Sequence, residues 1–395
     1  MVSGRNDLLR DRQSDEPDKV TFVELFFDLV FVFAITQLSH YLLKHFTPLG
    51  MAQTLVMLAG MWWIWIYTTW VMNELDPEKL PVRALLLTLM GVGLLLSASI
   101  PEAFDDRARP FAFAYVAMQL GRTLFFLWAV RGHRERVQNF QRIFVWLLIS
   151  AIFWLAGAFL GQDWQLLFWG IALTLEIISP SLGFAVPGLG RASATDWDVQ
   201  GAHFAERCAL FVLIALGETI LIIGATLGDT AWTSAAIAAA AASLIGSLAF
   251  WWLYFDTVAE IGKQRISRSR NPGALARLAY TYIHLLLVAG IVLAATGDEI
   301  VLSRPRGSVD VEMTVAVLGG PALFIVGNLL FGWSVTRRMA RSHLCAFIAL
   351  AAIAVAASRF TPLQMLASAS LVLVAVAAWE YWKSPDQTVP IEIAR

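Results

Sequence analysis

Two carboxylates stand in the first turns of a long apolar stretch, ELFFDLVFVFAIT, which begins at Glu24. On a helix that advances 100° per residue, Glu24 and Asp28 share one face with Phe31, Ile35 and Ser39. That face begins acidic and becomes apolar, then weakly polar, which is typical of a pore or cavity wall with a hydrophobic constriction. The alternative is structural: Glu24 caps the helix start, and Asp28 forms an ion pair that only fixes packing.

Arg122 is the candidate counter-charge for Asp28. Both lie at a similar depth in their predicted spans, roughly 12–13 Å from the same side at 1.5 Å per residue. At the positions that correspond in the second half of the chain, Leu210 and Asn328 replace them, so both charges are absent together. The sequence therefore predicts an ion pair between Asp28 and Arg122.

A second charged helix, HFAERCALFVLIALGET, begins at His203. It carries Glu206 and Arg207 near its start and Glu218 far inside the apolar run. An acid at that depth must be protonated, hydrated or paired with another helix, and the structural alternative is a neutral glutamic acid bonded to a nearby carbonyl. The candidate residues for an ion or substrate pathway are Glu24, Asp28, Phe31, Ile35, Ser39, Arg122, Glu206, Arg207 and Glu218.

Enzyme signatures are missing from the sequence. It contains no His-Glu-x-x-His, Gly-x-Ser-x-Gly, Walker or dinucleotide-binding motif, so we predict no catalytic residues and no cofactor. Its two cysteines, Cys208 and Cys345, fall inside apolar runs, where inert buried thiols are expected rather than metal ligands.

The composition is that of a membrane protein. Of the 395 residues, 58% are hydrophobic and 15% are charged, against about 25% charged in soluble domains. Apolar runs of roughly 20 residues recur along the chain, which predicts an all-α, polytopic helical membrane protein. The net charge of −1 and the scattered basic residues argue against a nucleic-acid partner. The twelve predicted spans are 20–43, 52–73, 83–101, 110–130, 142–161, 164–180, 203–227, 232–256, 276–297, 312–335, 342–358 and 361–382.

The basic residues also predict an orientation. Most Lys and Arg lie in the tails and in alternate connections, on the side that both termini share, and this side is expected to be cytoplasmic. The connections on the opposite side hold only Lys44, Arg107, Arg109, Arg304, Arg306 and Arg359. We therefore predict an inner-membrane protein with both termini in the cytoplasm.

The chain also resembles two copies of one six-span unit. The stretch WWIWIYT at 62–68 corresponds to WWLYFDT at 251–257, and Glu24 corresponds to Glu206. An even number of spans per copy predicts parallel repeats related by an axis along the membrane normal. The predicted organisation is a cytoplasmic tail at 1–19, a first repeat at 20–180, a linker at 181–202, a second repeat at 203–382 and a cytoplasmic tail at 383–395.

The first charged stretch closely resembles a family signature. VTFVELFFDLVFVFAITQLS at 20–39 is similar to the first motif of the bacterial low temperature requirement A proteins. Glu206-Arg207 and the stretch LGETI at 216–220 resemble the second motif of that family, and the likeness covers essentially the whole chain. The resemblance implies a multi-pass bacterial membrane protein. It implies no substrate and no catalytic residues.

A fainter likeness is to potassium channels that carry a Phe-Ser-Asp motif in their first helix. Phe26-Phe27-Asp28, followed by Phe31 and Ile35, has the same order of residue types. In those channels the first helices line a pore with apolar constrictions. This chain departs from them at Phe27, which replaces the serine, and at Glu24, which replaces an arginine.

Together these features predict a membrane protein that moves a small cation, a proton or a small solute. A channel would need a continuous path along the first span, whereas a carrier would need a midplane site, for which Glu218 is the best candidate. The alternative is a scaffold or envelope-stress protein whose buried charges are structural. The expected partners are the lipid bilayer, a small ion or solute and, as a homo-oligomer, further copies of the chain.

Overall fold

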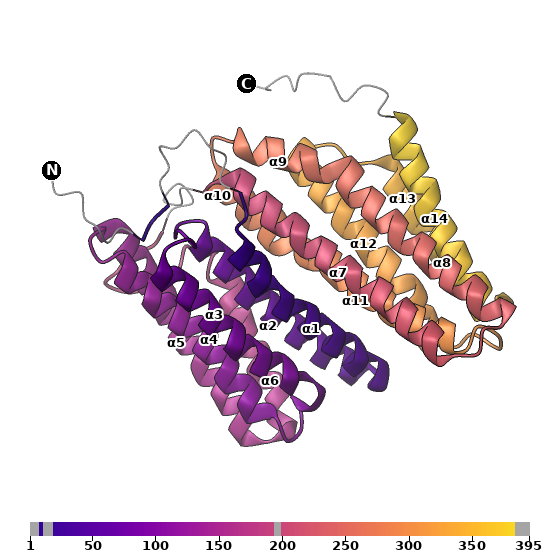
Figure 1. Cartoon of the computed structure of the whole chain (residues 1–395), viewed down its shortest axis with the longest axis horizontal. Helices are drawn as coiled ribbons and strands as arrows, with labels where there is room; N and C mark the ends of the chain where they lie inside the picture. The colour runs from indigo at the N-terminus through magenta and orange to yellow at the C-terminus, as the bar shows by residue number, and fades with distance from the viewer. Residues whose placement is uncertain (1–7, 11–18, 193–198, 384–395) are drawn as a thin grey trace. The chain divides into compact units, whose positions relative to one another are not determined.

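The computed structural model describes residues 8–10, 19–192 and 199–383, and the regular structure in these ranges is helical (Figure 1). Among the described residues there is no β-strand beyond isolated bridges. The helices in the first half are α1 (Phe22–Lys44), α2 (Pro48–Met72), α3 (Leu80–Ser99), η1 (Ile100–Glu102), α4 (Ala108–Ala129), α5 (Arg134–Leu160) and α6 (Gln162–Ile178). They are followed by α7 (Gly201–Asp229), α8 (Ser234–Trp251), η3 (Trp252–Ala259), α9 (Glu260–Ser267), α10 (Pro272–Leu275), η4 (Ala276–Ile283), α11 (His284–Ser303), α12 (Val311–Thr336), α13 (Arg341–Val355), η5 (Ala357–Arg359) and α14 (Pro362–Lys383).

The predicted all-α membrane fold is confirmed. Each of the twelve predicted spans coincides with a helix, and within the described ranges ten helices are long and apolar enough to cross a bilayer. The other two, α6 and α13, have 17 and 15 residues. The segment 257–275, predicted as a loop, is largely helical because η3, α9 and α10 continue the flanking spans.

Short polar side chains begin several helices. The Thr47 hydroxyl accepts a hydrogen bond from the Gly50 amide (3.1 Å) at the start of α2, where Pro48 fits the first turn because it lacks an amide hydrogen. The Asp310 carboxylate accepts one from the Met313 amide (2.7 Å) at the start of α12. These local signals end each connection and let the following apolar run continue as a helix.

The chain divides into two compact units. The first comprises Met1–Glu218 and Lys263–Leu285, and the second comprises Thr219–Gly262 and Leu286–Arg395. Compactness does not test internal repetition, so the two six-helix repeats stay a prediction.

The centre of the first unit is α2, which packs against α1, α4 and α6. Its middle is buried on every side, and Trp62, Trp63 and Trp65 are each at most 1% exposed. A helix that is apolar all round belongs in the interior of a bundle. Buried indoles need hydrogen-bond acceptors, and Trp62 donates its Nε1–H to the Thr281 carbonyl at 2.7 Å.

In the second unit, α11 and α12 approach through glycines. A methyl group at Gly290 would lie 2.6 Å from the Phe324 amide nitrogen, and one at Gly297 would lie 2.8 Å from the Ala316 carbonyl oxygen. The obstructing atoms belong to the main chain. Small residues therefore set the spacing of these two helices, as is common in membrane bundles.

Candidate functional site: buried charges on α1 and α7

The first turn of α1 folds around the Glu24 carboxylate. The Thr21 amide and hydroxyl both donate to Glu24 Oε2, each at 2.9 Å. Asp28 follows four residues later, on the same side of the helix, and both side chains are 0% exposed. Two carboxylates are thus buried one turn apart, which requires positive charge or several donors nearby.

Arg207 of α7 supplies the positive charge. Its Nη1 lies 3.2 Å from Glu24 Oε1, and its Nη2 lies 2.5 Å from Asp28 Oδ1. Trp65 of α2 donates its Nε1–H to the same Asp28 oxygen at 2.8 Å, and the guanidinium lies 5.6 Å from the centre of the Trp65 ring. One guanidinium therefore bridges both acids, and the Trp65 indole holds the Asp28 carboxylate with a further hydrogen bond.

Glu24 has two further basic neighbours. Arg10, from the segment before α1, places Nη2 3.3 Å from Glu24 Oε2. His203 Nε2 lies 3.2 Å from Glu24 Oε1, and the ring is held from its other side by Asn73 Nδ2 at 3.3 Å from Nδ1. We call Arg10, Glu24, Asp28, His203 and Arg207 the α1–α7 charge cluster.

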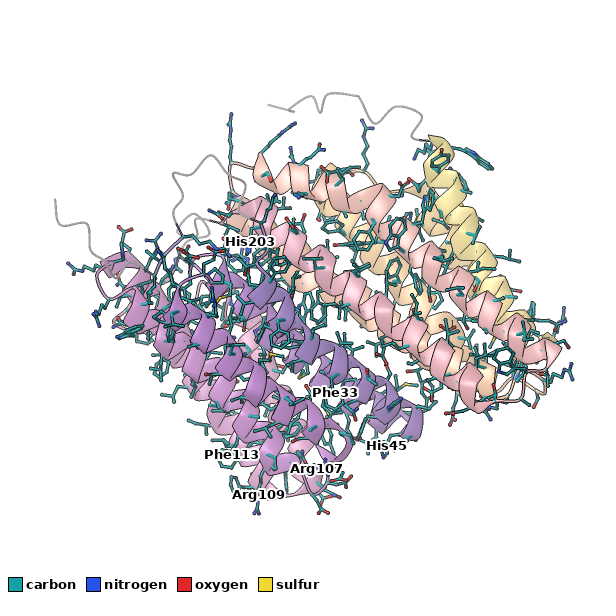
Figure 2. All side chains as sticks on the ribbon, in the orientation of Figure 1. Phe33, His45, Arg107, Arg109, Phe113 and His203 are labelled. Atoms are coloured by element: carbon teal, nitrogen blue, oxygen red, sulfur yellow. The ribbon has the colours of Figure 1, made fainter. Side chains whose placement is uncertain are left out.

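If His203 is neutral, the two negative charges of Glu24 and Asp28 equal the two positive charges of Arg10 and Arg207, and the cluster has no net charge. Figure 2 shows His203 at one end of the first unit and His45, Arg107 and Arg109 at the opposite end. The cluster therefore lies toward one end of the helices that form it.

The predicted Asp28–Arg122 pair is wrong. Arg122 is buried, but its guanidinium donates to the Ile64 carbonyl (3.1 Å), Thr68 Oγ1 (3.2 Å) and Gln119 Oε1 (2.5 Å). Depth alone could not choose between partners, because Arg207 follows the start of α7 by the same interval as Asp28 follows the start of α1. Helix adjacency decided the pairing.

Glu218 has a partner on another helix. The Thr36 hydroxyl of α1 lies 2.6 Å from Glu218 Oε2 and 3.2 Å from the Val32 carbonyl oxygen. Glu218 is 1% exposed. The sequence left open whether Glu218 is protonated, hydrated or paired with another helix. The structure shows a contact with another helix.

The predicted face of α1 is buried beyond the charge cluster, and aromatic side chains lie between that cluster and Glu218. Phe31, Ile35 and Ser39 are all at most 2% exposed. The Phe31 ring lies 6.1 Å from Phe211 of α7, whose ring lies 4.3 Å from Trp65. We call Phe31, Trp65 and Phe211 the aromatic layer.

Glu206 stands apart from these residues. Its side chain is 35% exposed and forms a loose ion pair with Lys263, with 3.7 Å between Oε2 and Nζ. It neighbours Arg207 in the sequence, but consecutive residues on a helix point in different directions. The structure therefore does not bring Glu206 into the charge cluster.

Glu176, the last acid of α6, was not among the candidates from the sequence. Its buried carboxylate accepts hydrogen bonds from four side chains of α4 and α5. These donors are Tyr115 (2.7 Å), Gln119 (2.8 Å), Ser150 (2.5 Å) and Trp154 (3.1 Å). The available signal was their spacing, because each helix contributes two donors four residues apart.

The two units contain an equivalent local arrangement. In the first, the Ile64 carbonyl accepts from the Thr68 hydroxyl and from Arg122. In the second, the Leu253 carbonyl accepts from the Thr257 hydroxyl and from Asn328. Ile64 and Leu253 hold the same position in the two related tryptophan stretches, and the two six-helix repeats stay a prediction.

Metal binding has no visible basis in the described part of the chain, where no three His, Cys, Asp or Glu side chains gather in a way that could hold an ion. What the α1–α7 charge cluster can do is exchange partners: Arg207 contacts two acids, and Glu24 contacts three bases. Glu24 can therefore exchange one basic partner for another, whereas Asp28 depends on Arg207 for its positive partner.

Comparison with known proteins identifies the family of the chain. Residues 19–378 match the family described as bacterial low temperature requirement A protein. An uncharacterized protein of Rhizobium meliloti (strain 1021) is 36% identical over 382 residues, covering 96% of this chain and 93% of the relative. No solved structure matches the chain. The match spans every helix of the charge cluster, and the chain belongs to the bacterial low temperature requirement A family of multi-pass membrane proteins.

Proposed function

We propose that this protein moves a small cation, a proton or a small solute across the membrane, with α1 and α7 forming the path. The observation that carries the proposal is the order of groups along these two helices. The α1–α7 charge cluster comes first, then the aromatic layer, and then Glu218 with Thr36. Polar sites on either side of an apolar constriction are typical of regulated permeation.

The cost of burying charge supports a functional role for these groups. Charged side chains inside a membrane are expensive and usually mark ion pathways or proton relays. A bundle that needed only packing would be about as stable with apolar residues in place of a buried ion pair. The position of Glu24, Asp28 and Arg207 at a helix interface, each 0% exposed, is therefore best explained by a task beyond packing.

Glu218 is the proposed coupling residue. Asp28 and Thr36 are eight residues apart on α1, about 12 Å along the axis, with Phe31 and Ile35 between them. A proton or cation that passes the aromatic layer would next meet the Glu218 carboxylate, whose partner Thr36 can donate to it or to the Val32 carbonyl. The hydroxyl can thus release the carboxylate without being left unpaired.

Flux through proteoliposomes tests the proposal. Purified protein is reconstituted, and proton, potassium and sodium gradients are followed with internal dyes. We expect wild-type flux above that of empty vesicles. Glu218→Gln should lower it at least tenfold while preserving expression and thermal stability, because the amide keeps the shape and an acceptor for Thr36. Glu102→Gln is the matched control, since Glu102 is an exposed acid paired with Arg107 at 2.8 Å.

Two results would count against transport. Wild-type vesicles that are as tight as empty ones to every cation and solute tried would favour the scaffold alternative. Unchanged flux in the Glu218→Gln protein would show that Glu218 is not part of the path. If Glu218→Gln instead prevented folding, Thr36→Val would probe the same contact without altering the acid.

A further inference from the structure

A second polar region of the first unit surrounds a cavity of about 60 Å³. Its lining combines apolar side chains with two arginines and several hydroxyl groups. At roughly 10–15 Å³ for each water-sized probe, the cavity holds a group of a few heavy atoms, such as a carboxylate or phosphate, and a longer ligand would extend beyond it. The lining includes Tyr67, Arg122, Phe140, Ile143, Phe184 and Arg277.

Arg122 lines this cavity and has one unused donor. Its two terminal nitrogens bond the Ile64 carbonyl, Thr68 and Gln119, but the buried Nε has no hydrogen-bond partner in the described structure. The side chain is only 1% exposed, and no carboxylate among the described residues forms an ion pair with it. A buried guanidinium that lacks a direct anion is costly, and it is satisfied when an anion enters.

Arg277 adds a second positive charge from an unusual helical segment. It belongs to η4, a π-helical stretch, and its Nη1 donates to the Pro180 carbonyl at 2.9 Å. Side chains compensate the widened turn: Thr281 bonds the Ala276 carbonyl, and His284 bonds the Ala279 carbonyl. π-helical turns occur frequently at binding sites, because they displace side chains from the regular helical spacing.

Glu176 only partly offsets this charge. Its carboxylate reaches Arg122 through Gln119, which donates to the acid and accepts from the guanidinium. Four side chains donate to the Glu176 carboxylate, which is not part of the cavity lining. Two guanidiniums therefore face one indirectly connected acid, which favours an anion in the cavity.

We propose that this cavity binds an amphiphilic organic acid, with its carboxylate or phosphate head between Arg122 and Arg277. Its apolar body would contact Phe140, Ile143 and Phe184. The position supports an amphiphile, because Tyr67, Phe140 and Arg277 all lie near helix ends, where a head group meets the membrane surface. The site uses none of the residues of the proposed transport path. Of the pathway candidates from the sequence, it uses only Arg122, which does not contact Asp28.

Saturable binding tests the proposal without any flux measurement. The full-length protein in nanodiscs of zwitterionic lipid is titrated with radiolabelled dodecanoate, and dodecyl phosphate, dodecanol and inorganic phosphate are used as competitors. We expect Arg277→Gln to weaken dodecanoate binding at least tenfold, and Arg131→Gln, an exposed arginine outside the lining, to leave it unchanged. Arg122→Gln should act like Arg277→Gln if it folds, and Glu218→Gln should bind normally.

The competitors identify the recognised chemistry. Competition by dodecyl phosphate, with dodecanol and inorganic phosphate each at least tenfold weaker, would support a site that needs both the charge and the chain. Nanodiscs that contain an anionic phospholipid then separate the sources: displacement of dodecanoate indicates a lipid head group, and no displacement indicates a free acid. Absence of saturable binding, equal competition by dodecanol, or wild-type affinity in Arg277→Gln would overturn the proposal.

Discussion

Arg207 shows how one residue can make two buried acids tolerable. Its guanidinium contacts Glu24 and Asp28 with different nitrogens, so both carboxylates depend on it. Glu24 retains Arg10 and His203 as further partners, whereas among the described residues Asp28 has only the Trp65 indole besides Arg207. Loss of Arg207 should therefore affect Asp28 more than Glu24.

A double-mutant cycle measures this coupling. We expect Arg207→Met to lower the free energy of unfolding in detergent by about 3–5 kcal/mol, because it leaves Asp28 as an uncompensated buried charge. Adding Asp28→Leu should recover part of the loss, giving a coupling energy of about 0.5–3 kcal/mol. The matched control combines Asp28→Leu with Arg122→Met, which should be additive. Additive losses for Asp28 and Arg207 would contradict the observed pair.

At the scale of elements, the spacing of α11 and α12 depends on the absence of side chains. The atoms that a methyl group at Gly290 would meet are the amide nitrogen and Cα of Phe324 and the Gly320 carbonyl oxygen. Main-chain atoms of a packed helix cannot move aside as a flexible side chain can. The two helices would have to separate along their contact.

Gly290→Ala should therefore destabilise the protein by about 1–3 kcal/mol, measured as the free energy of unfolding in detergent. Gly332→Ala on α12 is the control, because its added methyl group meets only Val258 Cγ1 at an ordinary 3.8 Å. Replacing a helical glycine without a clash should be neutral or slightly stabilising. Equal stability of the two variants would show that the α11–α12 contact is looser than described.

At the scale of the whole molecule, the distribution of Lys and Arg predicts the orientation in the membrane. Tags at both termini and at 268–271, between α9 and α10, should be accessible from the cytoplasm. Tags near 105 and 306, in the connections that follow η1 and α11, should be accessible only from outside. Membrane-impermeant labelling of single cysteines measures this, and an external C-terminus would contradict both the orientation and the even number of spans.

The sequence by itself determined the helical membrane fold, because runs of roughly 20 apolar residues can satisfy their backbone in a bilayer only as helices. It also identified Glu24, Asp28, Arg207 and Glu218, since charge inside such runs is conspicuous. Only the tertiary structure decided which charges meet: Arg207, rather than Arg122, contacts Asp28.

The physical reason is that periodicity and depth place a side chain on a helix face but do not say which helix faces it. Glu176 makes the same point, because its four donors come from two other helices and lie 22 to 61 residues away in the chain. The cavity beside Arg122 likewise exists only where α2, α4, α5, α10, η4 and the segment that follows α6 meet. Partners of this kind are set by packing between helices, which the linear pattern of one sequence does not encode.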